Sequence, residues 1–182
     1  CDAVQAAGKI PVDFEVLGAD YLVVSGHKLG GPKGAGALIV RPGAPFEPLF
    51  RGSGHERGRR GGTENVPGIV GLGLAAELAA REQRTEAVRL LALRERFERG
   101  LRIVVPDLVV HGARAPRLPN TVNAAFPGAS GETLVIALDL AGYAVSTGSA
   151  CASGAVTARH RGRTPPPLLI CHLPPPNGHV WT

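Results

Sequence analysis

The chain has 182 residues and a formal net charge of +5, with 44% hydrophobic and 19% charged residues. This balance predicts a packed core of one domain, or of one domain and part of another, and excludes wholesale disorder. Apolar runs such as residues 134–138 are far too short to span a bilayer, which needs about 20 residues, so we expect no membrane contact.

Cysteine, methionine and charge are unevenly distributed. The three cysteines form no CxxC pair, which fits a reducing compartment and predicts a cytoplasmic location. The sequence has no methionine and opens on Cys1, so we expect a processed product or a piece of a longer protein. No acidic residue follows Asp139, and three arginines in the tail 155–182 supply +3 of the net +5. The positive charge is therefore a poor argument for nucleic-acid binding, and we expect no direct nucleic-acid partner.

The first third of the chain predicts two strands and a long loop. Residues 20–25 and 36–40 are short runs rich in β-branched and apolar residues, and glycine or proline bounds each of them. Between them lies a loop rich in glycine and proline. Residues 51–62 contain five glycines, and the backbone entropy of glycine favours a second loop there.

A helical pattern begins at Glu64. Apolar residues recur with near-helical spacing as far as Leu101, which predicts two helices with a break near residues 82–86. Thr63 is a good candidate for the N-terminal cap, and Pro67 lies early enough to be tolerated in the first turn.

The remaining pattern predicts further strands and one more helix. We expect strands at 104–110, 121–125 and 143–146, a helix at 132–141 that Gly142 ends, and a loop of small residues at 147–154. This alternation of strands and helices indicates α/β or α+β layering. Residues 155–182 show neither period and contain two Pro-Pro-Pro triplets, so we expect them to be extended or disordered.

Three residues at the end of the first strand are candidates for a ligand site. Ligands of α/β sheets bind beyond the carboxyl ends of strands, which is where Ser25, His27 and Lys28 follow. Ser25 and His27 supply donors for an anion such as a phosphate. Lys28 can react with an aldehyde if its amine is deprotonated. The alternative is an ordinary surface lysine followed by a turn.

Two more candidates lie at opposite ends of the foldable region. Asp2 and Gln5 could address one heterocycle, because a carboxylate can hold a pyridine nitrogen protonated and an amide can donate to a ring oxygen; a solvated aspartate is the alternative. Cys151 lies among small residues that leave its thiol accessible, which suits a nucleophile that moves to its substrate. The alternative there is an inert buried thiol.

Two other patterns resemble nucleotide or nucleic-acid motifs but lack their context. Residues 55–63 resemble an RGG-type RNA-binding segment, yet they contain no aromatic residue to stack on bases, so an anion-binding or subunit-contact loop fits better. Residues 71–76 match GxGxxA, but they lie inside a helical pattern with no preceding strand. The histidines show no spacing typical of metal ligands.

Four segments together are far more specific than any one alone. In order, they read DAVQAAGKIPVDF, SGHKLGGPKGAGAL, GSGHERGRRGGTENVPGIVG and STGSACASG. This series resembles the cysteine desulfurases of the NifS/IscS type, which belong to the class V aminotransferase group of fold-type I pyridoxal phosphate (PLP) enzymes. The resemblance runs from Cys1 to about Gly154, and the long cysteine loop is similar to that of this desulfurase group.

The resemblance implies a PLP site made from the first 28 residues. Lys28 matches the lysine that holds PLP through its amine. Asp2 matches the partner of the pyridine nitrogen, and Gln5 matches the donor to the phenolic oxygen of the ring. Ser25 and His27 match positions that contact the phosphate.

The resemblance also implies a homodimer and a sulfur acceptor. Thr63 matches a threonine that reaches the phosphate bound to the other subunit. Cys151 matches the cysteine that takes sulfur from L-cysteine, leaving alanine, and passes it as a persulfide to an iron–sulfur scaffold protein or a tRNA-thiolation partner. The nearest rival is another class V PLP-dependent aminotransferase or lyase that needs no thiol. A rival of a different class is a non-catalytic RNA-binding or interaction protein that uses residues 51–62 and the basic tail.

The fold class that follows is α/β, an incomplete fold-type I PLP-dependent transferase. We expect residues 1–85 to belong to the large PLP-binding domain and residues 86–154 to form the small C-terminal domain with the cysteine loop. Residues 155–182 are expected to be an aberrant tail, whose arginines are not assigned to the substrate carboxylate. Because the family's N-terminal part is missing, we expect this chain alone to bind PLP weakly or not at all and to be inactive.

Overall fold

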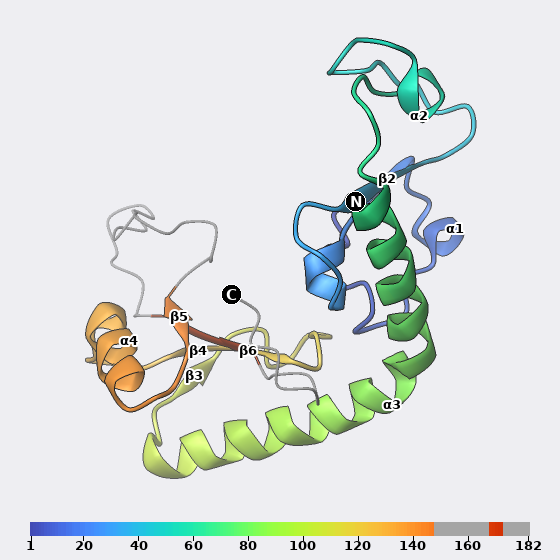
Figure 1. The fold of residues 1–182 in the computed structure, drawn as a ribbon. Helices are drawn as coiled ribbons and strands as arrows, with labels where there is room; N and C mark the ends of the chain where they lie inside the picture. The colour runs from blue at the N-terminus through green and yellow to red at the C-terminus, as the bar shows by residue number, and fades with distance from the viewer. Residues whose placement is uncertain (148–167, 173–182) are drawn as a thin grey trace. The chain divides into compact units, whose positions relative to one another are not determined.

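The computed structural model describes residues 1–147 and 168–172 (Figure 1). The chain divides into two compact units, the first formed by Cys1–Glu86 and the second beginning at Ala87. None of the helices in the described ranges combines the length and the apolar character that crossing a membrane requires.

The first unit is built on a small sheet. Strand β1, Tyr21–Ser25, pairs antiparallel with strand β2, Gly36–Val40, so both predicted strands are confirmed. Residues 1–3 run parallel to β1 on its other side, with Asp2 opposite Val23. Backbone hydrogen bonds of 3.0 Å on both sides of Asp2 hold this segment in place.

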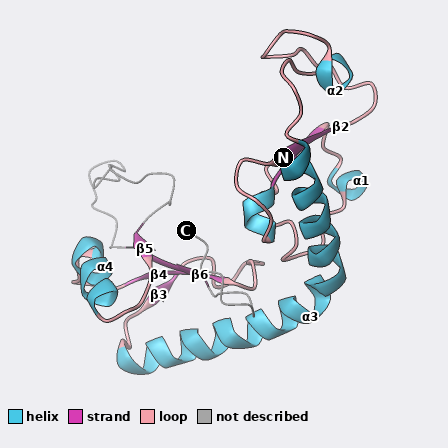
Figure 2. Cartoon of the chain, viewed as in Figure 1, coloured by secondary structure: helices cyan, strands magenta, loops and turns pink. Residues whose placement is uncertain are grey.

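Three short helical turns complete the first unit (Figure 2). Helix α1, Phe14–Leu17, begins at Asp13, whose carboxylate accepts two backbone N–H bonds. The 3₁₀ helix η1, Gly26–Leu29, follows β1 directly. Helix α2, His55–Gly58, is one irregular turn inside the predicted loop 51–62, and three of its residues, Glu56, Arg57 and Gly58, have a positive φ.

Helix α3, Val66–Val104, is a single helix of 39 residues that enters both units. The predicted break near residues 82–86 is therefore wrong. That segment contains neither glycine nor proline, and its polar residues suit the exposed side of a helix. Thr63 is also not the cap: Asn65 Oδ1 accepts a hydrogen bond from Gly68 N at 3.2 Å. Pro67 lies in the first turn, as predicted.

The second unit contains an antiparallel sheet in the order β3-β4-β6-β5. Its strands are β3 (Val109–Val110), β4 (Thr121–Ala125), β5 (Ser146–Thr147) and β6 (Leu168–His172). Helix α4, Gly131–Leu140, begins at the capping hydroxyl of Ser130 and ends before Gly142, whose φ is +84°. The strand predicted at 121–125 and the helix predicted at 132–141 are confirmed. The strand predicted at 104–110 is reduced to its last two residues, because α3 continues through Val104.

Strand β6 corrects the expectation for the tail. Residues 168–172 were expected to lack regular structure, yet they pair with β4 along its whole length. They form a five-residue run of apolar and polar residues that the proline triplets flank without interrupting, so every backbone N–H of the run can join the ladder. The other residues of the tail, and the loop 148–154, lie outside the described residues.

Apolar packing and one ion-pair cluster hold the second unit together. Leu108, Val110, Val122 and Ala124 form its core, and Phe97 of α3 packs against them.

In the cluster, both guanidinium nitrogens of Arg117 donate to Glu98 of α3, at 2.7 and 3.2 Å. Arg94, only 9% exposed, donates to the carbonyl of Leu118 at 2.6 Å. The cluster therefore ties α3 to the loop before β4.

Glu98→Ala is expected to lower the free energy of unfolding by about 2–4 kcal/mol, because it leaves the largely buried Arg94 and Arg117 without the carboxylate that both pair with. Glu77→Ala is the matched control: its ion pair with Arg81 lies on an exposed part of α3, and its loss should cost about 0.5 kcal/mol or less. Urea unfolding measures both values. Equal losses in the two variants would contradict the assigned role of the cluster.

Candidate functional site

The segment Ser25 to Lys28 joins the end of β1 to η1. Ser25 Oγ and His27 Nδ1 lie 2.8 Å apart in a hydrogen bond, and both side chains are half-buried. Lys28 is also half-buried on η1, which ends at Gly30 in the left-handed region with a φ of +87°. A hydroxyl, an imidazole and an amine thus lie in one short turn, and the hydroxyl and the imidazole are hydrogen-bonded to each other.

Asp2 lies beside the same strand. One Asp2 carboxylate oxygen accepts a hydrogen bond from Val4 N at 2.9 Å, which fixes the side chain against its own backbone. The carbonyl of Ala3 then accepts from the N–H groups of Ala6 and Ala7, so Gln5 lies in the helical turn that follows. Asp2 and Gln5 are both exposed in this structure. The pairing of residues 1–3 with β1 therefore brings Asp2 to the strand that leads to Lys28.

Close backbone packing fixes the loop that follows Lys28. A Cβ at Gly71 of α3 would lie 2.8 Å from Pro32 Cγ, and one at Gly31 would lie 3.0 Å from Ala75 Cβ. Gly26 is buried, and a Cβ there would approach the carbonyl oxygen of Ala35 to 3.0 Å. Only glycine permits these approaches. The GxGxxA match at 71–76 is therefore a packing feature of α3.

Lys9 is a residue that the sequence analysis missed. Its Nζ is buried and has no hydrogen-bond partner. Burial, and then the charge of Lys28, lower the pKa of the Lys9 amine from 10.5 to about 8. The preceding Gly8, with a φ of +74°, packs so closely that a Cβ there would lie 2.9 Å from Leu29 Cδ2 and 3.0 Å from Ala79 Cβ. The sequence shows Lys9 as the lysine of the segment AGKIP, but the neighbouring residues give no indication that its side chain is buried.

The other predicted residues are not brought to Lys28 by the described part of the structure. Thr63 is exposed in the loop before α3, and Cys151 lies outside the described residues. Near Thr63, Glu64 Oε1 accepts a hydrogen bond from Glu56 N at 3.4 Å, and bonds from backbone N–H groups lower the pKa of Glu64.

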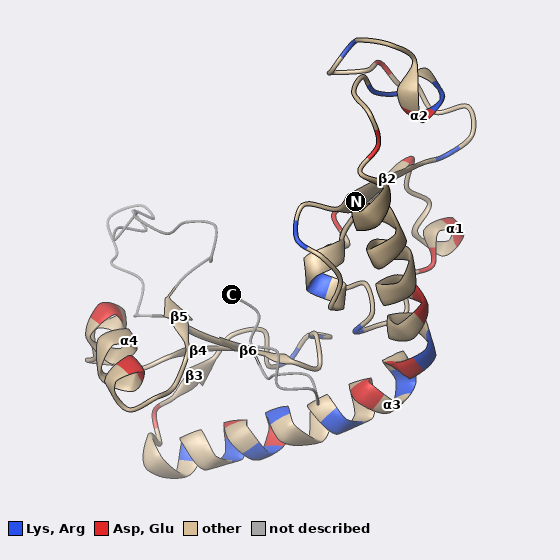
Figure 3. Ribbon diagram, viewed as in Figure 1, with Lys and Arg blue, Asp and Glu red and all other residues tan. Residues whose placement is uncertain are grey.

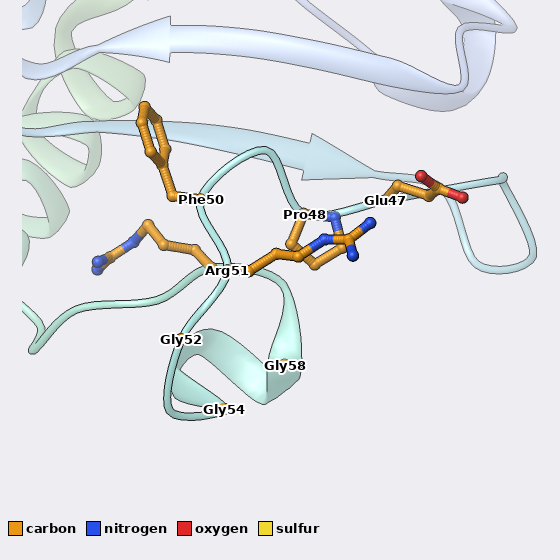
Figure 4. Close-up of a pocket in the computed structure, with 8 residues that line it drawn as sticks. Glu47, Pro48, Phe50, Arg51, Gly52, Gly54 and Gly58 are labelled. Carbon is orange, nitrogen blue, oxygen red and sulfur yellow. The ribbon is translucent and has the colours of Figure 1, made fainter.

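A shallow hollow of about 410 Å³ lies in the loop that contains α2 (Figure 4). It is lined by Glu47, Pro48, Phe50, Arg51, Gly52, Gly54, Gly58 and Arg60. This hollow has no amine, thiol or imidazole, and it does not include Lys28. None of the described residues predicted for the site lines this hollow. Figure 3 shows acidic and basic residues interspersed along α3 after its uncharged first turns.

The model of the class-V aminotransferase family matches residues 1–164, which is most of the chain and extends past Gly154. The chain therefore belongs to the aminotransferase class-V family, a family of PLP-dependent enzymes. It is 52% identical over 159 residues to a cysteine desulfurase of Gluconacetobacter diazotrophicus, and 54% identical over 159 residues to one of Cereibacter sphaeroides. Each match covers 87% of this chain and 40% of the relative, so the chain spans less than half the length of these relatives.

Solved structures give the same assignment of the fold. A NifS-like protein from Rickettsia africae matches with a TM-score of 0.82 and 31% identity, over 94% of this chain and 47% of that one. A second NifS-like protein matches with a TM-score of 0.79 and 38% identity, over 94% and 46%. The predicted fold class is thus confirmed: the chain has the mixed α/β fold of part of a fold-type I PLP enzyme.

The described side chains fit PLP chemically. A carboxylate, a hydroxyl–imidazole pair and an amine, from Asp2, Ser25, His27 and Lys28, match the ring nitrogen, the phosphate and the aldehyde of that cofactor. The unpartnered Nζ of Lys9 next to this group is an orphaned buried polar atom, which is typical of a functional site.

Gly71→Ala is expected to destabilise the chain by about 1–3 kcal/mol, because its methyl group would overlap Pro32. Gly73→Ala is the matched control, two residues further along the same helix: a Cβ there meets nothing within 4 Å, so alanine should stabilise the helix by up to about 1 kcal/mol. Denaturant unfolding compares the two variants. A stabilising effect at both positions would contradict the close packing of α3 on the Pro32 loop.

Lys9→Met is expected to make the chain more stable at pH 7, by up to about 3 kcal/mol. The folded chain releases the Lys9 proton near pH 8 and the unfolded chain near pH 10.5, so wild-type stability gains from rising pH between these values. The advantage of the variant should therefore shrink between pH 7 and pH 9.5 in urea unfolding. An advantage that stays constant with pH would show that the Lys9 amine is not buried as a charge.

Proposed function

We propose that this chain carries part of a PLP-dependent cysteine desulfurase, including the lysine that binds the cofactor and the cysteine that accepts sulfur. The observation that carries the proposal is the joined Ser25–His27 pair next to Lys28, on a strand that pairs with Asp2. Sequence identity of about half to named cysteine desulfurases supports this choice within the family.

Each of the predicted site residues has a distinct part in holding the cofactor. Lys28 bonds to the cofactor through its amine. Ser25 and His27 donate hydrogen bonds to the phosphate, and Gln5 donates to the phenolic oxygen. The Asp2 carboxylate keeps a proton on the ring nitrogen, because a neighbouring negative charge favours the cationic form. When bound, PLP supplies an electron sink for the α-carbon of an amino acid.

Lys28 and Cys151 then act on L-cysteine in sequence. The free amine of Lys28 removes the α-proton of the substrate and later returns a proton to it. The Cys151 thiolate attacks the substrate sulfur: an S–S bond forms on Cys151 while the C–S bond breaks. The products are L-alanine and a persulfide on Cys151, and the atoms balance without an added oxidant. A solved structure of SspA in complex with cysteine, at a TM-score of 0.65 and 32% identity over 96% of this chain and 49% of that one, supports L-cysteine as the substrate.

Partners and location follow from the same chemistry. The persulfide passes to a sulfur-acceptor protein, such as an iron–sulfur scaffold or a tRNA-thiolation partner. Thr63 reaches the cofactor phosphate of a second subunit, which makes the functional unit a homodimer. Because Cys151 has to remain a free thiol between turnovers, a reducing compartment such as the cytoplasm suits the protein.

The chain has three lysines, Lys9, Lys28 and Lys33, and one further primary amine at Cys1, so peptide mapping has four amines to distinguish when it locates PLP. After incubation with PLP, borohydride reduction and peptide mass spectrometry, the adduct is expected on Lys28 in clear preference to the exposed Lys33. Lys28→Ala should remove that adduct. Labelling that favours Lys33 would contradict the proposed cofactor site.

Cys151→Ser separates a desulfurase from a class V enzyme that needs no thiol. In the complete PLP-loaded enzyme that contains this chain, L-cysteine is expected to add sulfur to Cys151, with Cys1 and Cys171 as internal controls, and the variant should lose this sulfur while it still binds PLP. Alanine production that continues in the variant would favour the rival reading. Mass spectrometry of the cysteine peptides provides the measurement.

A further inference from the structure

The first turns of α3 are apolar around the whole helix. Residues 66–80 contain one charged residue, Glu77, whereas charged residues recur along the rest of α3 (Figure 3). A surface helix has one apolar and one polar side, and a helix that is apolar on every side is normally buried on every side. The sequence of these turns therefore predicts packing partners on two opposite sides.

One side of these turns has its partner within the first unit. Leu72 and Ala75 are buried on this side. A Cβ at Gly26 would lie 3.4 Å from Leu72 Cδ1, and one at Gly31 would lie 3.0 Å from Ala75 Cβ. The segment that follows β1 therefore covers the side of α3 that carries Leu72 and Ala75.

The opposite side of the same turns is an exposed apolar stripe. The stripe consists of four residues at intervals of four, each between 41% and 65% exposed: Val66, Val70, Leu74 and Leu78. Residues at this interval form a ridge of the kind that packs into the groove of a second helix. Glu77 and Arg81, the charged residues beside the stripe, pair with each other at 2.7 Å, so the stripe suits an apolar partner.

The sheet of the first unit also has an apolar side that the described residues leave exposed. Val23 of β1 and Leu38 of β2 lie directly opposite each other in the ladder, and both are exposed. A sheet side that faces water normally carries polar residues, so this pair predicts a further covering layer. The helix and the sheet thus both indicate that the first unit is the inner part of a larger domain.

The length of the relatives indicates where such a layer comes from. The match covers 40% of the cysteine desulfurase of Gluconacetobacter diazotrophicus and 47% of the solved NifS-like protein from Rickettsia africae. More than half of each relative thus lies outside the match. A second copy of this chain is the weaker candidate, because a stable dimer interface takes about 20–30 residues from each partner, and the stripe has four.

We propose that the stripe is an internal docking surface for a helix of the class V fold, from the part of that fold that lies outside this chain. The apolar side of that helix packs against the ridge, so the four side chains of the stripe are buried in the complete enzyme. Neither PLP nor the proposed reaction is needed for this packing. The docking surface and the proposed function can therefore fail independently of each other.

The test compares a cysteine substitution in the stripe with a matched one further along α3. Val70 is 65% exposed and Val88 is 71% exposed, so Val70→Cys and Val88→Cys should react with a maleimide at rates within about twofold of each other in the 182-residue chain. In the complete enzyme that contains this chain, Val70→Cys is expected to react at least about tenfold more slowly, whereas Val88→Cys should keep its rate. Peptide mass spectrometry separates these thiols from the three native cysteines. Leu74→Cys repeats the test at a second place in the stripe.

Dilution separates the two candidate partners. In the 182-residue chain the rate at Val70→Cys should be the same from about 1 to 100 μM protein, because the proposed partner is not present at any concentration. Protection that grows with concentration would assign the stripe to a contact between copies and overturn the proposal. Equal rates at Val70→Cys in the 182-residue chain and in the complete enzyme would also overturn it, and so would equal protection of Val70→Cys and Val88→Cys.

Discussion

Parallel pairing of the first three residues with β1 is the interaction on which the site depends. Two backbone hydrogen bonds of 3.0 Å, on either side of Asp2, hold this segment against Val23. The same strand ends two residues later at Ser25 and turns into η1, where Lys28 lies. Two residues 26 positions apart in the sequence, Asp2 and Lys28, therefore lie beside one strand and in the turn that follows it. Without this pairing, the carboxylate and the amine would have no fixed relation.

Local patterns predicted most of the fold where local physics decides it. The strands at 20–25 and 36–40 follow from short apolar runs between chain-turning residues, and the end of α4 follows from Gly142. The predictions that were wrong concern segments whose structure depends on contacts with residues distant in the sequence. Residues 168–172 form β6 because β4 offers a ladder partner, and proline-rich flanks conceal that. The continuity of α3 was missed because a polar stretch without glycine or proline weakens the apolar pattern but does not break a helix.

The candidate site was predicted from motifs, and the structure adds what motifs cannot contain. Residue types and spacing singled out Asp2, Ser25, His27 and Lys28, because their chemistry suits PLP. Lys9 escaped notice, since a lysine next to Gly8 reads as an ordinary turn residue. Its unusual environment arises from packing on η1 and α3, which are remote in sequence, and from a second cation there. Burial and electrostatics of this kind depend on the folded chain.

The most direct test of the account is a crystal structure, grown with PLP, of the complete enzyme that contains this chain. The account predicts continuous electron density from Lys28 Nζ to the cofactor, with the ring nitrogen against the Asp2 carboxylate and the phosphate next to Ser25 and His27. Density for the cofactor at another lysine, or Asp2 and Lys28 opening onto separate regions with no shared cavity, would contradict it.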